Sequence, residues 1–150
     1  MRAVIQRVSE ASVTIGDREH ARIRHGLLVL LGIAIGDTSE DLEWLAGKIA
    51  RMRLFPDETG VMNLDINASN GEVLLISQFT LLAETAKGNR PSYIRASRPE
   101  EAMPLYLRAK QLLSELLHGR VRTGEFGADM QVSLINDGPV TIVIDSKVRD

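Results

Sequence analysis

The stretch LINDGPVTIVID, residues 134–145, has the composition of a strand on both sides of a central proline. Proline cannot donate to a strand ladder, so Pro139 predicts that two strands meet here through something other than an ordinary tight turn. The turn-forming residues 136–138 directly before it favour a hairpin with a Gly-Pro corner. This corner is therefore the first feature whose purpose needs an explanation.

Outward from this stretch, the spacing of apolar residues predicts a series of strands and two separated helices. Strand patterns cover residues 3–15, 21–24, 27–35 and 72–80, and helix patterns cover 38–56 and 99–118. The run LLVLLGIAI at 27–35 predicts a strand buried on both faces. Thr38 and Asp41 suit a capping box at the start of the first helix, and Pro56 ends its run. Sequential strands with two separated helices favour an α+β fold with a curled, mostly antiparallel, barrel-like sheet.

Length and composition limit the possible functions. With 150 residues and 44% hydrophobic residues, the chain is expected to form a single domain over 1–150. The absence of cysteine excludes a disulfide framework, a thiolate zinc site and a cysteine nucleophile. A net charge of -2 argues against a protein that coats nucleic acid, but it allows a local basic patch. Without a long apolar segment or a signal-peptide core, we expect a cytoplasmic protein that has no membrane partner.

Conventional catalytic and metal motifs are missing from the sequence. His20, His25 and His118 lie far apart and lack metal-ligand spacing, which favours structural roles and predicts no metal and no cofactor. No G-x-S-x-G elbow, P-loop or H-E-x-x-H motif occurs. The tetrapeptide SQFT at 77–80 closes an otherwise apolar strand. It is either a functional cluster or a plain strand end.

A basic segment, KGNRPSYIRASR at 87–98, follows this cluster. It carries four cations without an acidic residue, namely Lys87, Arg90, Arg95 and Arg98. Such a segment is either a solvated loop or an arm that binds phosphates, and the pattern alone leaves both open.

Taken together, the motifs are more specific than any of them alone. The segments are MRAVIQRVSEASVTI at 1–15, SQFTL at 77–81, KGNRPS at 87–92, TGEFGADMQVSL at 123–134 and NDGPVT at 136–141. Their order and spacing resemble the D-aminoacyl-tRNA deacylase family over essentially the whole chain. SQFT and NDGPVT correspond to the signature motifs of that family, and both are intact. Departures fall at variable positions and in the tail after Ile144.

The resemblance implies a homodimeric hydrolase that cleaves the ester bond of D-aminoacyl-tRNA, and of glycyl-tRNA. It implies a cis Gly138-Pro139 bond, although only ~5% of X-Pro bonds in folded proteins are cis. Each subunit's Gly138-Pro139 would enter the other's pocket beside residues 77–80. Its backbone carbonyls would occupy the space that the side chain of an L-amino acid needs, so selection would operate by exclusion.

The same resemblance implies roles for individual residues. Ser77, Gln78, Phe79 and Thr80 would form the catalytic segment, whose backbone orients the ester carbonyl and supplies oxyanion donors. The 2′-hydroxyl of the tRNA would assist the attack, and Thr80 would position the substrate. Phe126 and Met130 would be pocket walls, with core packing as the alternative. The basic segment 87–98 would hold the acceptor end of tRNA through its phosphates.

Two other functions remain open on the sequence. One is a conventional esterase that uses Thr80 or Ser77 as nucleophile. The other is a non-catalytic module that binds tRNA or D-amino acids, because the fold also resembles proofreading domains attached to some synthetases.

Overall fold

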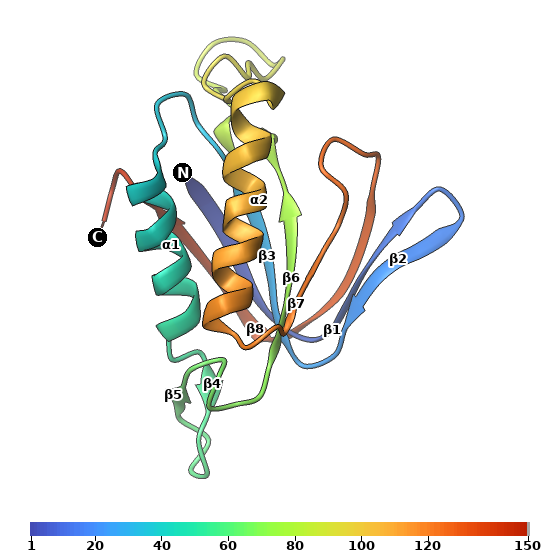
Figure 1. Cartoon of the computed structure of the whole chain (residues 1–150), viewed down its shortest axis with the longest axis vertical. Coiled ribbons are helices and arrows are strands. Elements are labelled where there is room, and N and C mark those ends of the chain that lie inside the picture. Colours follow the sequence, from blue (N-terminus) through green and yellow to red (C-terminus); the bar gives the residue numbers. More distant parts are fainter. Residues whose placement is uncertain (150) are drawn as a thin grey trace.

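A curled sheet and two helices on one of its faces make up the structure (Figure 1). The computed structural model describes residues 1–149, and Asp150, the last residue of the expected domain, lies outside the described residues. The helices are α1 (Ser39–Arg51), α2 (Pro99–Leu116) and a short 3₁₀ helix (Phe79–Leu82). The strands are β1 (Arg2–Ile15), β2 (Arg18–Ile23), β3 (Gly26–Gly32), β4 (Phe55–Pro56), β5 (Met62–Leu64), β6 (Glu72–Ser77), β7 (Val121–Thr123) and β8 (Gln131–Asp145).

The main sheet has the strand order β2-β1-β3-β6-β7, and β8 pairs with β1 as well. β1 is antiparallel to β2, β3 and β8, whereas β3 and β6 are parallel, as are β6 and β7. The expected α+β class with a nearly closed, barrel-like sheet and two main helices is confirmed. The sheet is mixed rather than mostly antiparallel, because α1 and α2 lie in crossover connections, which join parallel neighbours.

β1 runs through the whole sheet and bends it. Its first half pairs with β3 and the end of β8, and its second half pairs with β2 and the start of β8. The register against β8 shifts on both sides of Val8. Irregular pairing of this kind bends and twists a strand, and here it accompanies the curl of the sheet seen in Figure 1.

The hairpin predicted at 134–145 is wrong. The two flanks of the corner do not pair with each other, because both run along β1 as parts of β8. Pairing stops at Asn136, opposite Val8, and resumes at Thr141, opposite Gln6. Residues 137–140 therefore bulge out of a single strand, and the proline lies where no ladder bond is required.

Several predicted boundaries also move. The strand predicted over 72–80 ends at Ser77, because the chain turns into the 3₁₀ helix two residues later. The first helix ends at Arg51 instead of continuing to Pro56, since Met52 adopts an extended backbone. Its predicted capping contact is present, with the Thr38 N–H donating to the Asp41 carboxylate at 2.9 Å.

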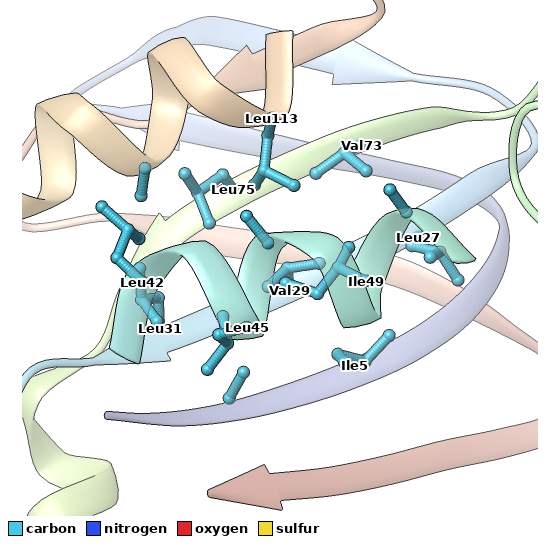
Figure 2. Close-up of a cluster of buried hydrophobic side chains, with 14 of the residues drawn as sticks. Ile5, Leu27, Val29, Leu31, Leu42, Leu45, Ile49, Val73, Leu75 and Leu113 are labelled. Carbon is cyan, nitrogen blue, oxygen red and sulfur yellow. The ribbon is translucent and has the colours of Figure 1, made fainter. Parts of the chain in front are cut away.

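The core lies between the sheet and the helices. Leu42, Leu45 and Ile49 of α1 point toward the strands, and Leu113 approaches from α2 (Figure 2). β3 sends Leu27, Val29 and Leu31 into this cluster and Leu28 into a second cluster inside the curl of the sheet. This arrangement confirms that β3 is buried on both faces. No helix within 1–149 is both long enough and apolar enough to cross a membrane.

Candidate active site

A cavity of about 490 Å³ lies beside the carboxyl ends of β3 and β6. Ser77, Gln78 and Phe79 line it on one side, and Phe126 and Met130 lie in the facing loop before β8. The structure thus brings together five of the residues predicted for the site, although more than forty positions separate the two groups in sequence. The rest of its lining comes from Leu31, Ile33, Ile76, Ser97, Pro99, Ala102, Gly127, Ala128, Asp129 and Val132.

The end of the β6 ladder determines where the SQFT segment lies. The Gln78 N–H donates to the Leu31 carbonyl at 2.8 Å, and the chain then leaves the sheet. The 3₁₀ helix begins at the next residue, Phe79. Residues after the carboxyl end of a parallel strand commonly form binding sites, because the chain there is released from the ladder beside its neighbour.

The first two residues of this 3₁₀ helix present backbone N–H groups that have no hydrogen-bond partner among residues 1–149. Hydrogen bonding of the turn starts with the Leu81 N–H, which donates to the Gln78 carbonyl at 3.2 Å. The N–H groups of Phe79 and Thr80 precede that bond, so the helix itself cannot satisfy them. The Thr80 hydroxyl is held by the Gln78 side-chain amide at 2.5 Å. Thr80 does not line the cavity, although it is part of the same turn.

The facing wall is supported by the core. The Phe126 ring packs on Tyr106 of α2, with 5.5 Å between the ring centroids. The Tyr106 hydroxyl donates to the Leu75 carbonyl at 3.0 Å, and burial of this side chain raises its pKa to about 12. Met130 lies so close to Gly124 that a Cβ at that glycine would come within 2.4 Å of its sulfur. The wall is therefore held by tight packing.

Asp129 is the one ionisable side chain in the cavity lining among residues 1–149, and a histidine-based triad is not complete there. Among residues 1–149, none of the three histidines lines the cavity, and the His25 ring packs instead on Phe55, 4.9 Å away. No group of three or more His, Asp or Glu residues in the described part of the chain is placed to hold a metal ion. The polar groups at hand are the side chains of Ser77, Gln78, Ser97 and Asp129 and the free backbone N–H groups.

The basic segment lies next to this turn. All four of its cations are exposed, and only Arg95 has an acidic neighbour, Glu84 at 3.8 Å, among residues 1–149. Within the segment, the Tyr93 ring meets the Phe79 ring edge-on, with 5.1 Å between centroids. The ring contact places Tyr93 beside the SQFT turn, and Lys87 and Arg90 have no acidic partner among residues 1–149.

The Gly-Pro corner stands apart from the cavity. The Gly138-Pro139 bond is cis, as predicted, and both residues are exposed. Arg7, which supports the corner from β1, is level with Leu27 of β3, whereas Ser77 is level with Leu31. Four residues along a strand correspond to about 13 Å. Accordingly, neither Gly138 nor Pro139 lines the cavity of its own chain.

Two side chains support the corner. Arg7 donates to the Asp137 carbonyl at 2.9 Å and to the Leu54 carbonyl at 2.6 Å. The Asn136 side chain accepts from the Val140 N–H at 2.7 Å, which closes the bulge at its base. A guanidinium has several donors in a rigid fork, so one Arg7 side chain can bind two carbonyls at once.

The backbone at Gly138 permits no other residue without strain. Its φ of +145° lies in a region that only glycine adopts readily. A Cβ there would lie 2.7 Å from a methyl group of Val140 and 3.2 Å from the Arg7 guanidinium. The glycine is thus required both by its conformation and by the contacts that hold the corner.

Our sequence interpretation missed Arg7, Tyr93 and Tyr106. For Arg7 a signal existed, because it follows Ala3 and Ile5 at alternate positions of β1 and so shares their buried face. Its side chain is only 11% exposed. A charged residue on a buried face needs partners, and here the partners are carbonyls of the corner and of Leu54. The two tyrosines had no comparable signal, since their partners are distant in sequence.

Comparison with known proteins agrees with this arrangement of motifs. The family model described as D-Tyr-tRNA(Tyr) deacylase matches residues 4–145. A D-aminoacyl-tRNA deacylase of Akkermansia muciniphila is 60% identical over 150 residues, with 100% of both chains covered. One of Cytophaga hutchinsonii is 59% identical over 147 residues, which is 98% of each chain.

Solved structures agree in fold. The c-Myc DNA unwinding element binding protein superposes with a TM-score of 0.92 at 40% identity, covering 97% of this chain and 98% of the other. A probable eukaryotic D-amino acid tRNA deacylase shares the fold with a TM-score of 0.83 at 15% identity, covering 95% and 97%. The resemblance drawn from the sequence motifs is confirmed by the family model and the close relatives. The chain belongs to the D-Tyr-tRNA(Tyr) deacylase family.

Proposed function

We propose that this hydrolase cleaves the ester of D-aminoacyl-tRNA and rejects L-aminoacyl-tRNA by means of the Gly138-Pro139 corner of a second copy of the chain. The observation that carries the proposal is that the cavity and the Gly138-Pro139 corner lie apart within one chain. One is a cavity beside free backbone donors, and the other is a built, exposed corner that does not reach the cavity of its own chain. A dimer would bring them together.

The exposed edge of β8 supports a homodimer. Leu134, Ile135 and Val143 on this strand are 37%, 55% and 62% exposed, and they flank the corner in sequence. An exposed apolar strand is a surface that another chain can cover. Light scattering is expected to give twice the chain mass of 16.5 kDa. A monomer that is fully active at nanomolar concentration would contradict the proposal.

Selection in trans can be tested with mixed dimers. Gly138→Ala is expected to disable the corner. Gly124→Ala would place a Cβ 2.4 Å from the Met130 sulfur, so Met130 must shift, and this is expected to impair the cavity wall. In a mixed dimer one of the two sites pairs a normal corner with a normal cavity. Mixing the two variants under exchange conditions is therefore expected to restore selective activity to up to about a quarter of the wild-type level. Absence of any recovery in verified mixed dimers would exclude action in trans.

Hydrolysis would use the backbone donors at the start of the 3₁₀ helix. Water adds to the ester carbonyl carbon, and the carbonyl oxygen takes negative charge facing the Phe79 and Thr80 N–H groups. The bond from that carbon to the ribose 3′ oxygen then breaks, and this oxygen takes up a proton. Preorganised donors of this kind contribute ~10²-fold or more each to the rate.

The tRNA itself would assist the proton transfers. Within residues 1–149, no histidine lines the cavity, while the terminal ribose carries a 2′-hydroxyl beside the scissile ester. A 2′-deoxy terminal adenosine is expected to leave binding nearly intact and to lower the single-turnover rate by at least ~10²-fold. Thr80→Ala should cost much less. A normal rate with the deoxy substrate, together with an inactive Thr80→Ala variant, would favour the esterase with a side-chain nucleophile; Ser77→Ala tests the other candidate.

Exclusion of a side chain predicts that glycine is accepted. A site that only blocks L-side chains has nothing to block in glycine, and a pocket distinguishes one small group by about 1–3 kcal/mol. Glycyl-tRNA is therefore expected to be hydrolysed, and L-alanyl-tRNA to be spared. If glycyl-tRNA survives as long as L-alanyl-tRNA, the pocket must recognise the D-side chain directly.

The four cations of the basic segment would hold the acceptor end of the tRNA. Lys87 and Arg90 are exposed and can contact phosphates without reading sequence. The first experiment is release of amino acid from D-tyrosyl-tRNA at substoichiometric protein, with L-tyrosyl-tRNA as control. Several turnovers on the D-substrate alone are expected. Binding without turnover would instead indicate a non-catalytic module.

A further inference from the structure

The Phe79 side chain is poorly supported for a residue whose backbone faces a reacting ester. Its ring is 56% exposed, although the N–H groups of Phe79 and Thr80 must be held steady to act as oxyanion donors. The ring does have one aromatic neighbour, Tyr93, which meets it edge-on at 5.1 Å and 74°. We infer that Tyr93 is a positioning residue that holds this turn for hydrolysis, an inference that rests on the proposed function.

Tyr93 is able to serve as a support because its own segment is anchored on two sides. On one side, Glu84 and Ser92 exchange two backbone hydrogen bonds, of 2.8 and 3.0 Å. On the other, the Ser97 N–H donates to the Ile33 carbonyl at 2.9 Å and ties the segment to the end of β3. The ring of Tyr93 therefore stands on a segment fixed to the same strand end that borders the cavity.

The geometry also shows which part of the tyrosine matters. Edge-to-face aromatic contact depends on the ring and needs no hydroxyl. The Tyr93 hydroxyl makes no hydrogen bond within residues 1–149, so phenylalanine should replace it fully. Its neighbour Ile94 is 73% exposed and supplies a matched control, because truncating it shortens an apolar side chain in the same segment.

The test uses single-turnover hydrolysis of D-tyrosyl-tRNA at saturating enzyme, with tRNA affinity measured separately. Tyr93→Ala is expected to lower the rate by ~10-fold, since small misplacement of reacting groups costs one to two orders of magnitude. Affinity for tRNA should change by less than ~3-fold. Tyr93→Phe and Ile94→Ala should both stay within ~2-fold of the wild-type rate.

A second readout does not depend on activity. Hydrogen exchange of the amides in residues 77–82 should be faster in Tyr93→Ala and unchanged in Tyr93→Phe and Ile94→Ala. Tyr93→Leu replaces the alanine variant if that protein does not fold, and it should slow hydrolysis at least ~3-fold. If the wild type fails to hydrolyse the substrate, the proposed function falls, and the exchange measurement still decides whether Tyr93 positions the turn.

Three results would overturn the inference. The first is unchanged hydrolysis and unchanged exchange in Tyr93→Ala. The second is a loss in Tyr93→Phe as large as in Tyr93→Ala, which would give the hydroxyl a role that the ring contact does not explain. The third is a loss confined to tRNA affinity, which would make Tyr93 a simple RNA contact.

Discussion

The cavity beside Ser77 and the corner at Gly138-Pro139 differ in how each is held. The cavity is backed by the core, through Tyr106 and Leu75 on one side and the tight contact of Met130 with Gly124 on the other. The corner is exposed and depends on polar contacts from two side chains. Substitutions in a tightly packed wall lower the free energy of unfolding. An exposed corner, by contrast, can change its conformation while the rest of the protein stays folded.

This difference separates stability from selectivity. Changes at the corner should alter the ratio of D- to L-substrate hydrolysis while the protein stays folded. Changes behind the cavity should alter the free energy of unfolding first. Each of the following variants tests one side of that contrast.

The largest effect is expected from Gly138→Ala. Its φ of +145° and the 2.7 Å approach to Val140 force the corner to shift, so the ratio of kcat/KM for D- to L-tyrosyl-tRNA should fall by at least ~10²-fold. Gly60→Ala is the control, because it has a φ of +83° but open space around its Cβ. Gly60→Ala should cost about 1–2 kcal/mol of stability and Gly138→Ala about 1–3 kcal/mol. Equal selectivity in the two variants would contradict a selective role for the corner.

An intermediate effect is expected from Arg7→Lys. Lysine keeps the charge but lacks the fork that reaches the Asp137 and Leu54 carbonyls together, so the corner should loosen and selectivity should fall by ~10-fold. Arg22→Lys serves as the control, since Arg22 is half exposed and pairs with Glu19 on the surface. Steady-state kinetics on both substrates measure the difference. Unchanged selectivity in Arg7→Lys would mean that Asn136 alone holds the corner.

The smallest effect on hydrolysis is expected from Tyr106→Phe. The ring that supports Phe126 remains, while the hydrogen bond to the Leu75 carbonyl is lost and leaves a buried acceptor with one partner fewer. Denaturant unfolding should show a loss of about 1 kcal/mol, with less than a ~3-fold change in kcat/KM. A large loss of selectivity without loss of stability would show that the cavity wall, and not only the corner, controls selectivity.

Stability at low pH offers a further check at the start of α1, none of whose residues lines the cavity. Burial raises the pKa of Asp41, but hydrogen bonds from Lys147 and Thr38 outweigh it and leave the pKa well below its usual value. A lowered pKa contributes stability above the unfolded value of about 4, and this contribution is lost as the pH falls below it. Asp41→Asn should therefore make the free energy of unfolding less dependent on pH, as measured by unfolding between about pH 2 and 5. The ratio of D- to L-substrate hydrolysis should stay unchanged.

Much of the site could be predicted because its chemistry lies in short motifs. SQFT, the walls Phe126 and Met130, and the cis Gly138-Pro139 bond were expected from the family resemblance that these motifs carry, whereas the residues alone would have favoured a trans bond. The structure places the first two groups around one cavity. Thr80 is the exception among the catalytic candidates, since its side chain turns to Gln78 instead of lining the cavity. Short motifs specify local backbone, but they do not specify which side chains converge.

The hairpin failed for a related reason. Strand composition on both sides of Pro139 shows that two strand segments exist, but not which partner each one chooses. Both segments pair with β1, which lies about 130 positions away in sequence, as the contact of Arg7 with Asp137 illustrates. The parallel pairing of β3 with β6 was missed in the same way.

The sequence by itself therefore determined the local elements of this protein: the buried strand β3, which ends at Gly32 and not at the predicted residue 35, the cap of α1, the turn-forming corner, and the motifs that identify its family. Apolar periods and turn chemistry act over a few residues, so they can be recognised along the chain. Only the tertiary structure decided that the SQFT turn faces the loop at 124–130, that the Tyr93 ring contacts the Phe79 ring, and that the corner lies away from the cavity of its own chain. These outcomes depend on which distant strands pair and where β1 bends, and such long-range choices are made by the packing of the whole molecule.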